Sequence, residues 1–283
     1  MANNWAEFAP DLVSHEFEIY DNVTTGMNMP TFHGHSFYEF RFISQGRVTH
    51  YSENSVCELG PGDISVMPPS VFHRVVFEPP KEGINKYSRI LLYVSVPFMR
   101  YLETDQFKIS EVFNAFGYPG DRHLHLEMPE LDALYHPLQQ IVRADRDDDP
   151  LQHLQNRAQI MLLLSRLAEY IARNDTPART AEDSALVPRV IAYINANLDD
   201  NLSLDSLSAR FFVSKFYLSH RFKEYTRLSL HQYVLIRRMM HAQKLLHAGE
   251  SPTAVAAACG YREYSSFYKA FLRETGKTPR DFE

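Results

Sequence analysis

The chain has 283 residues, 45% of them apolar, which is enough for one or two domains with buried cores. Its formal net charge of −6 would argue against nucleic-acid binding if the charge were spread evenly. However, the residues from Ser184 to Glu283 contain 14 Lys and Arg against 9 Asp and Glu, whereas the rest of the chain contains 15 against 26. A basic C-terminal third behind an acidic front is typical of a DNA-binding domain joined to a domain of another kind. Chance variation in surface charge is the alternative.

The cysteines and the N-terminal residues bear on the cellular compartment in which the protein is expected. Cys57 and Cys259 are far apart and have no spacing typical of a metal knuckle or a disulfide framework, which favours a reducing environment. The N-terminus lacks a basic stretch followed by an apolar core, and no run approaches about 18 uncharged apolar residues. We therefore expect a cytoplasmic protein without a membrane span.

The first part of the chain, from Phe17 to about Val96, has short apolar runs separated by turn signals. Regular spacing of this kind predicts an antiparallel sandwich or small barrel rather than a parallel sheet. The turn signals include Ser44-Gln45-Gly46, Gly60-Pro61-Gly62-Asp63, Pro68-Pro69-Ser70 and Glu78-Pro79-Pro80.

From Pro97 onward the pattern is helical. Helices are predicted at Pro129–Ala144 and Pro150–Arg173, each with proline near its first turn. The second contains the apolar run 160–164, so we expect it to pack on the barrel and to leave one face for a second subunit; a purely intramolecular core is the alternative. The polar segment 174–185 is the predicted linker, which divides the chain into domains at 1–173 and 186–283.

The C-terminal domain is predicted to be all helical. Serines at 203 and 214 are placed to cap two of its helices. The predicted helices are Val187–Leu198, Leu204–Phe211, Lys215–Tyr225, Leu230–His247, Thr253–Cys259, and Tyr264 or Ser265 to Thr275.

This domain also repeats itself at an offset of 49 positions. Leu218 and Phe222 return as Phe267 and Phe271, and the repeat continues through the pairs Thr226 and Thr275, Ser229 and Thr278, and Tyr233 and Phe282. Apolar residues at i and i+4 press one face of a short helix onto its neighbours and leave the other face exposed. Each copy is interpreted as a helix-turn-helix. The helix between them spans about 27 Å, which suits two reading helices entering major grooves about 34 Å apart.

Three stretches carry a family resemblance. They are Ser214-Lys215-Phe216-Tyr217-Leu218-Ser219-His220-Arg221-Phe222-Lys223, then Ala256-Ala257-Ala258-Cys259-Gly260-Tyr261, then Ser266-Phe267-Tyr268-Lys269-Ala270-Phe271 with the closing Gly276-Lys277-Thr278-Pro279. The chain from about 186 to 283 resembles the AraC/XylS family of bacterial transcription regulators. The resemblance implies that the exposed face of each reading helix contacts DNA.

The implied DNA contacts fall into two groups. Base contacts would come from Phe216, Ser219, His220, Tyr264, Ser265, Tyr268 and Lys269, and phosphate contacts from Lys215, Arg221, Lys223, Arg262 and Arg273. The alternatives are that the aromatic residues belong partly to the core and that the cations are merely solvated. Arg227 departs from the family pattern, which has glycine there. A non-glycine residue in a left-handed cap costs roughly 1 kcal/mol, so the sequence leaves open how the first reading helix ends.

The front domain has a pattern of its own. His33-x-His35-x-x-x-Glu39, six residues and Gly46, followed later by Gly62, Pro68 and His73, resembles the two motifs of the cupin barrel, although Ser70 and Phe77 depart from the second motif. Alternation along a strand predicts that His33, His35 and Glu39 share one face, with His73 opposite on a paired strand and Arg41 on the face of Glu39. The residues His33, His35, Glu39 and His73 are candidate ligands of a divalent metal, but direct contact with a small molecule and structural hydrogen bonding remain open.

Together these features predict an α+β protein with a cupin-like antiparallel β-barrel, a helical dimerisation element and an all-α double helix-turn-helix domain. The predicted function is a ligand-responsive transcription regulator, expected to be an activator and a homodimer, with promoter DNA, RNA polymerase and a small-molecule effector as partners. The effector is expected to contact His33, His35, Glu39, Arg41 and His73. A sugar suits the nearby aromatic residues, and an organic acid paired with Arg41 is the alternative. The rival prediction is a metal-dependent cupin enzyme tethered to nucleic acid.

Overall fold

The computed structural model describes residues 12, 14, 16–26, 32–53, 56–78, 86–117, 123–144, 149–173 and 186–282. The chain divides into two compact units, Asp11–Thr180 and Ala181–Glu283 together with Met1–Pro10. We call the first the barrel unit and the second the helical unit, and each is considered by itself. The predicted linker at 174–185 lies outside the described residues. No helix in the described ranges is long and apolar enough to cross a bilayer.

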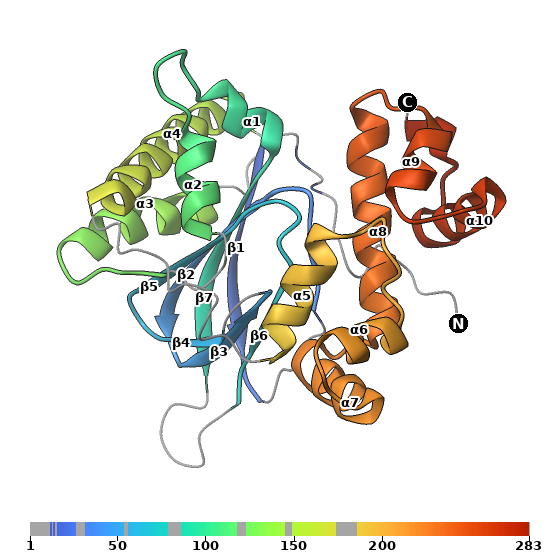
Figure 1. Ribbon diagram of the computed structural model, residues 1–283. Helices are drawn as coiled ribbons and strands as arrows, with labels where there is room; N and C mark the ends of the chain where they lie inside the picture. The colour runs from blue at the N-terminus through green and yellow to red at the C-terminus, as the bar shows by residue number, and fades with distance from the viewer. Residues whose placement is uncertain are drawn as a thin grey trace. The chain divides into compact units, whose positions relative to one another are not determined.

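The strands of the barrel unit form two antiparallel sheets (Figure 1). The larger sheet has the order β1-β7-β2-β5-β8 and the smaller one the order β4-β3-β6. The strands are β1 (Phe17–Thr24), β2 (Tyr38–Gln45), β3 (Val48–Ser52), β4 (Val56–Leu59), β5 (Asp63–Met67), β6 (His73–Val76), β7 (Tyr87–Val94) and β8 (His123–His125). The predicted antiparallel cupin-like architecture is confirmed.

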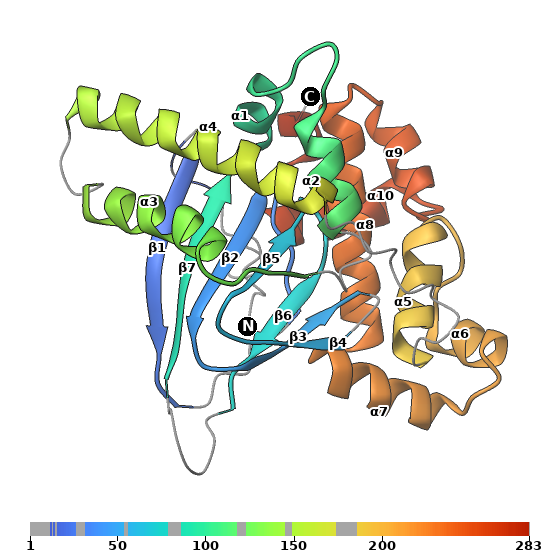
Figure 2. The same cartoon turned by 90° about the vertical axis from the view of Figure 1, so that its left-hand side faces the viewer.

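Helices cover one face of the larger sheet (Figure 2). They are α1 (Val96–Tyr101), α2 (Ile109–Gly117), α3 (Glu130–Ala144) and α4 (Pro150–Arg173). The predicted bounds of α4 are confirmed, and α3 begins one residue later than expected. The strand β8 was missed, because three residues that extend a sheet edge through pairing with β5 have no local pattern that separates them from a loop.

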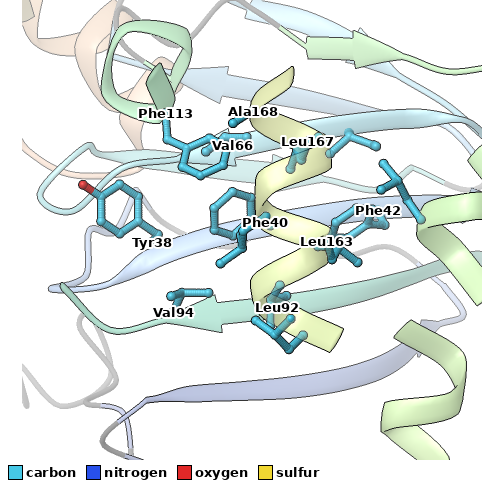
Figure 3. Close-up of a cluster of buried hydrophobic side chains, with 14 of the residues drawn as sticks. Tyr38, Phe40, Phe42, Val66, Leu92, Val94, Phe113, Leu163, Leu167 and Ala168 are labelled. Atoms are coloured by element: carbon cyan, nitrogen blue, oxygen red, sulfur yellow. The ribbon is translucent and has the colours of Figure 1, made fainter. Parts of the chain in front are cut away.

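Successive side chains of β2 point to opposite faces of the larger sheet, and this alternation decides which of them face the helices. Tyr38, Phe40 and Phe42 project toward the helices, and Figure 3 shows them with side chains of α2 and α4 in one apolar cluster. Phe40 is fully buried, with its ring 4.9 Å from that of Phe113 in an edge-on arrangement. Burying a side chain of this size contributes about 1.5–3 kcal/mol, and a shift of one residue would turn all of them to the other face. The same register therefore directs Glu39 and Arg41 away from the helices.

The helical unit confirms the predicted helices to within two residues at each end. Ser203 and Ser214 accept hydrogen bonds from the backbone N–H groups of Ser206 and Tyr217, as the capping pattern predicted. The helices are α5 (Leu186–Ala196), α6 (Leu204–Arg210), α7 (Lys215–Thr226), α8 (Leu230–His247), α9 (Pro252–Ala258) and α10 (Tyr264–Thr275), with a final 3-10 turn at Pro279–Phe282.

The repeat extends to single hydrogen bonds. The hydroxyls of Thr226 and Thr275, at the ends of α7 and α10, each lie 2.8 Å from the carbonyl oxygen four residues earlier. Each also accepts a hydrogen bond from the backbone N–H two residues later. Both helices then end in a left-handed residue, Arg227 with φ 62° and Gly276 with φ 72°. The first reading helix thus ends in the same way as the second, despite the non-glycine cap.

Arg238 of α8 contacts the segment between α5 and α6, which precedes the first helix-turn-helix. Its guanidinium donates to the carbonyl oxygens of Leu198 and Asp200, at 3.0 and 2.7 Å. Gly260, from the second helix-turn-helix, packs against the same guanidinium, and a Cβ there would lie 2.4 Å from Arg238 Nη2. One side chain of α8 therefore contacts both the segment that leads into the first helix-turn-helix and the turn of the second.

The left-handed residues that end α7 and α10 predict opposite effects of two substitutions on stability. Arg227→Gly should raise the free energy of unfolding by about 1 kcal/mol, because glycine tolerates a positive φ without the clash of a Cβ. Gly276→Ala, where no atom lies within 4 Å of the added Cβ, should lower it by a similar amount. Urea unfolding followed by circular dichroism measures both. Equal stability of Arg227→Gly and the unmodified protein would show that the first cap is not strained.

Candidate functional site

A cluster of buried polar side chains lies between the two sheets of the barrel unit. Glu39 and Arg41 project inward from β2, and His73 comes from the start of β6 in the facing sheet. His35 precedes β2 and is also buried. His33 and His35 were predicted to lie on the strand itself. Instead they lie before it, where His33 forms an isolated bridge with His73.

Glu39 is the centre of the cluster. The Arg41 guanidinium donates through Nη2 to Glu39 Oε1 in a short contact. The other carboxylate oxygen, Oε2, lies 3.5 Å from His35 Nε2 and 3.7 Å from His73 Nε2. Burial alone would raise the pKa of Glu39, but the charge of the Arg41 guanidinium outweighs it and holds the pKa well below its usual range. Glu39 is therefore a buried carboxylate that stays ionised.

His33 lies at the edge of the cluster. The ring of His33 is 4.6 Å from that of His73, centre to centre, and the residue is half-buried. The donor atoms that converge, within 4.8 Å of one another, belong to His35, Glu39 and His73. Three of the four predicted donors thus come together, and the fourth packs beside them.

Further polar groups on the inward face have no hydrogen-bond partner among the described residues. They are Nη1 of Arg41, the hydroxyls of Ser65 and Tyr87, and Nε2 of His50. Ser65 lies directly opposite Arg41 in the pairing of β2 with β5, so their side chains share the inward face. Leaving such a group unpaired costs about 1–3 kcal/mol, and a buried water molecule or a polar ligand can satisfy it.

Sequence reasoning missed His50, Ser65 and Tyr87. Burial on β3 alternates through Val48, His50 and Ser52, and this period of two could have placed His50 inside. β5 is buried along its whole length and therefore gives no such signal for Ser65. Burial is the main cause of the depressed pKa of His50 and of the raised pKa of Tyr87. Both groups are thus held in their neutral forms.

In the helical unit, the predicted DNA contacts lie on the exposed faces of the two reading helices. Phe216 is 82% exposed, and its ring lies 6.2 Å from that of His220 one turn on. The opposite side of α7 buries Leu218 and Phe222. The other predicted contacts are also exposed except Tyr268, which is half-buried: Lys215, Ser219, Arg221, Lys223, Arg262, Tyr264, Ser265, Lys269 and Arg273.

The predicted cations differ in their surroundings. Lys215, Arg221 and Arg273 form ion pairs with Asp205, Glu224 and Glu274. The pairs of Lys215 and Arg221 are exposed on both sides and are worth at most about 1 kcal/mol, so phosphate groups could replace those two carboxylates, whereas Glu274 is buried. Among the described residues, the cations at 223, 262 and 269 have no acidic partner. These three cations could contact phosphate groups without first giving up an ion pair.

A cleft of about 930 Å³ lies between the two copies of the repeat and along α8. Ser219 of α7 and Arg262, just before α10, line it together with Arg238. Predicted contacts from both copies therefore border one concave surface.

Both units match models of known protein families. A family model described as an AraC-like ligand binding domain matches residues 15–168, and one described as a helix-turn-helix domain matches residues 207–283. The chain belongs to the AraC family. This membership confirms the resemblance read from the repeat and extends it to the barrel unit.

Curated relatives of this AraC-family chain are regulators. An HTH-type transcriptional regulator of Staphylococcus aureus (strain COL) is 23% identical over 242 residues, covering 85% of this chain and 30% of that protein. The regulatory protein PocR of Salmonella typhimurium is 30% identical over 112 residues, covering 39% and 37%. The chain spans about a third of the length of these relatives.

Solved structures are also similar. ToxT from Vibrio cholerae, bound to an unsaturated fatty acid, matches over 95% of each chain at 12% identity with a TM-score of 0.42. The DNA-binding domain of AdpA in complex with a target DNA matches 33% of this chain and 86% of that one, at 27% identity with a TM-score of 0.32.

Proposed function

We propose that this AraC-family protein is a ligand-responsive transcription regulator, in which the helical unit reads operator DNA and the barrel unit binds a small polar effector. The observation that carries the proposal is the repeated reading helix. In each copy one face is locked into the core by a pair of apolar residues, and the other face presents aromatic, hydroxyl and cationic side chains. An exposed face of this composition suits base edges and phosphates rather than a protein core.

The two reading helices have distinct roles in this proposal. Phe216 contacts a thymine methyl group, and Lys269 donates to a guanine edge, which are both ordinary forms of major-groove readout. Lys223 and Arg262 contact phosphates and set the register without reading sequence. The 18-residue α8 between them holds the two helices for successive turns of one duplex face.

The effector is a sugar or a related sugar acid. Within the described part of the chain, four buried polar groups on the inward face have no hydrogen-bond partner, and hydroxyl groups of a sugar can both donate to and accept from them. The ring of Phe37 lies 4.7 Å from that of Tyr93 and stacks on His35 at 4.2 Å, which supplies an aromatic wall beside the cluster. A carboxylate on the sugar would pair with Nη1 of Arg41.

Dimerisation is assigned to the solvent side of α4. Leu151, Leu154 and Leu162 are 53–61% exposed on a helix whose other face is buried on the sheet. Leucines that recur at helical spacing on an exposed face fit a symmetric contact with a second copy. Activation through contact with RNA polymerase is part of the proposal, and a promoter–reporter assay with and without effector tests its sign.

DNA readout is tested by substitutions on the reading helices. Phe216→Ala and Lys269→Ala should each weaken specific binding by about 10-fold or more, because each removes one base contact worth about 1–3 kcal/mol. Lys223→Ala should weaken binding to all sequences alike and reduce the salt dependence. Fluorescence anisotropy with a duplex selected from a random library measures these affinities. Lys244→Ala, an exposed lysine of α8, is the charge-matched control. Unchanged affinity for the selected duplex in both base-contact variants would refute the assignment.

The effector site is tested by removing two hydroxyls. Ser65→Ala with Tyr87→Phe should leave the stability of the free protein unchanged or higher, because neither hydroxyl has a partner within the described residues. The same double variant should bind the effector at least about 10-fold more weakly. A thermal-shift screen of monosaccharides, disaccharides, uronic acids and aromatic acids, with and without chelator, identifies the compound. A double variant that loses stability but keeps full effector affinity would make these hydroxyls structural.

The dimer is tested by charging the leucine face. Leu154→Glu with Leu162→Glu should convert a dimer to a monomer in sedimentation velocity, because a buried unpaired carboxylate in an interface is strongly unfavourable. Val56→Glu, at a valine 49% exposed on β4, brings the same kind of charge to another apolar surface site as the control. If the leucine variant and the control sediment alike, dimerisation through α4 is excluded.

A further inference from the structure

Three electron-pair donors face one another inside the barrel unit. His35, His73 and Glu39 each offer one donor atom, and the three atoms lie within 4.8 Å of one another; Oε2 of Glu39 faces Nε2 of both imidazoles. Their side chains are nearly inaccessible to solvent, with residues 1%, 0% and 3% exposed. Lone pairs brought together at this depth repel unless a proton or a cation lies between them.

Hydrogen bonding on the far side of each ring fixes where the protons are. His35 Nδ1 lies 2.8 Å from the carbonyl oxygen of Phe37, and His73 Nδ1 lies 3.2 Å from that of Val71. A carbonyl oxygen only accepts, so each Nδ1 carries the proton and donates it. In the neutral ring, Nε2 is then left with its lone pair directed at Glu39.

The distances match shared coordination better than hydrogen bonding. Charge-assisted N–H···O bonds are about 2.7–2.9 Å long, whereas Oε2 is 3.5 and 3.7 Å from the two Nε2 atoms. Donors bound at about 2.0–2.1 Å to one tetrahedral ion are separated by roughly 3.4 Å. Neither Nε2 has a hydrogen-bond partner among the described residues.

The outer contacts are those that a metal centre uses. Backbone carbonyls orient both imidazoles through Nδ1, and Arg41 holds Oε1 of Glu39, which leaves Oε2 for the ion. Such outer contacts fix the tautomer and the direction of each ligand. Arg41 thus acts as a positioning residue.

We propose that His35, Glu39 and His73 bind one divalent first-row transition metal ion. Imidazole nitrogen with a carboxylate oxygen suits zinc, iron, manganese, cobalt or nickel. Three protein donors leave at least one coordination position for a water molecule or an oxygen of the effector. Only this last step rests on the proposed function, and an effector with adjacent oxygens, such as a hydroxy acid or a sugar acid, would bind there as a chelate.

Titration of the full chain with cobalt and zinc tests the site. After removal of metal with chelator, one equivalent of Co²⁺ per chain should bind and give visible absorption bands, which Zn²⁺ then displaces. His35→Ala and the near-isosteric Glu39→Gln should each weaken binding at least 10-fold. Circular dichroism of each variant establishes that it is folded, and operator affinity provides a second check in the same samples.

Two further histidine variants sharpen the donor assignment. His125→Ala, beside Asp63 on the surface of the same unit, is the matched control and should bind metal like the unmodified chain. His33→Ala should also retain the site, because His33 packs against His73 outside the convergence. Loss of metal in His33→Ala would overturn the three-donor assignment.

The remaining outcomes separate this inference from the proposed function. No stoichiometric binding by the unmodified chain, or full binding by Glu39→Gln, overturns the metal site. If the effector response persists in either case, the regulator remains and only the metal is lost. Failure of both the metal and the effector to bind would count against the barrel unit as a sensor of any kind.

Discussion

The burial of an ionised carboxylate between two sheets is the constraint on which the barrel unit depends. Glu39 is compensated by Arg41 on its own strand, and its other oxygen faces imidazoles from the segment before β2 and from β6, so three parts of the unit meet at one residue. Removing one member of such a pair while the other stays buried costs about 3–5 kcal/mol. The apolar side of β2 holds the register that makes this possible, because Phe40 and its neighbours have no other place to pack. Core and cluster are thus two faces of the same strand.

The helical unit uses the same local structure in both of its reading helices. Each reading helix must be rigid on one side and available on the other, and the apolar pair, the threonine hydroxyl and the left-handed cap supply the rigidity twice over. Arg238 of α8 then contacts both the segment before α6 and Gly260 in the second helix-turn-helix. The 18-residue α8 connects the two copies within one unit.

Much of this architecture could be predicted from the sequence, because its signals are local. Serine caps, prolines at first turns and apolar residues at i and i+4 placed α4, α7 and α8 within a residue of their observed bounds. The motif spacing also brought Glu39 and His73 to one place. The position of His33, the strand β8 and the inward hydroxyl of Ser65 could not be predicted in this way. Each depends on pairing between segments that are distant in the chain, and a continuously buried strand such as β5 shows no alternation.

At Arg227 the local sequence signal was clear, but it did not determine the structure. The sequence identified the unfavourable residue correctly, but local propensity did not decide the outcome. The buried hydroxyl of Thr226 and the packing of Leu228 select the left-handed turn, and the strain is accepted there because the surrounding contacts determine the backbone.

The central claim is that occupancy of the barrel and binding of DNA are coupled in one chain. The most direct measurement is the affinity of the barrel's effector, taken by calorimetry in the absence of DNA and again with saturating operator duplex. Linkage requires that, if effector changes operator affinity by some factor, operator changes effector affinity by the same factor. A coupled regulator should give different affinities in the two titrations, with a ratio equal to the effector's own effect on operator binding. Identical affinities would contradict this coupling, because ligand binding in the barrel unit would then have no effect on DNA binding by the reading helices.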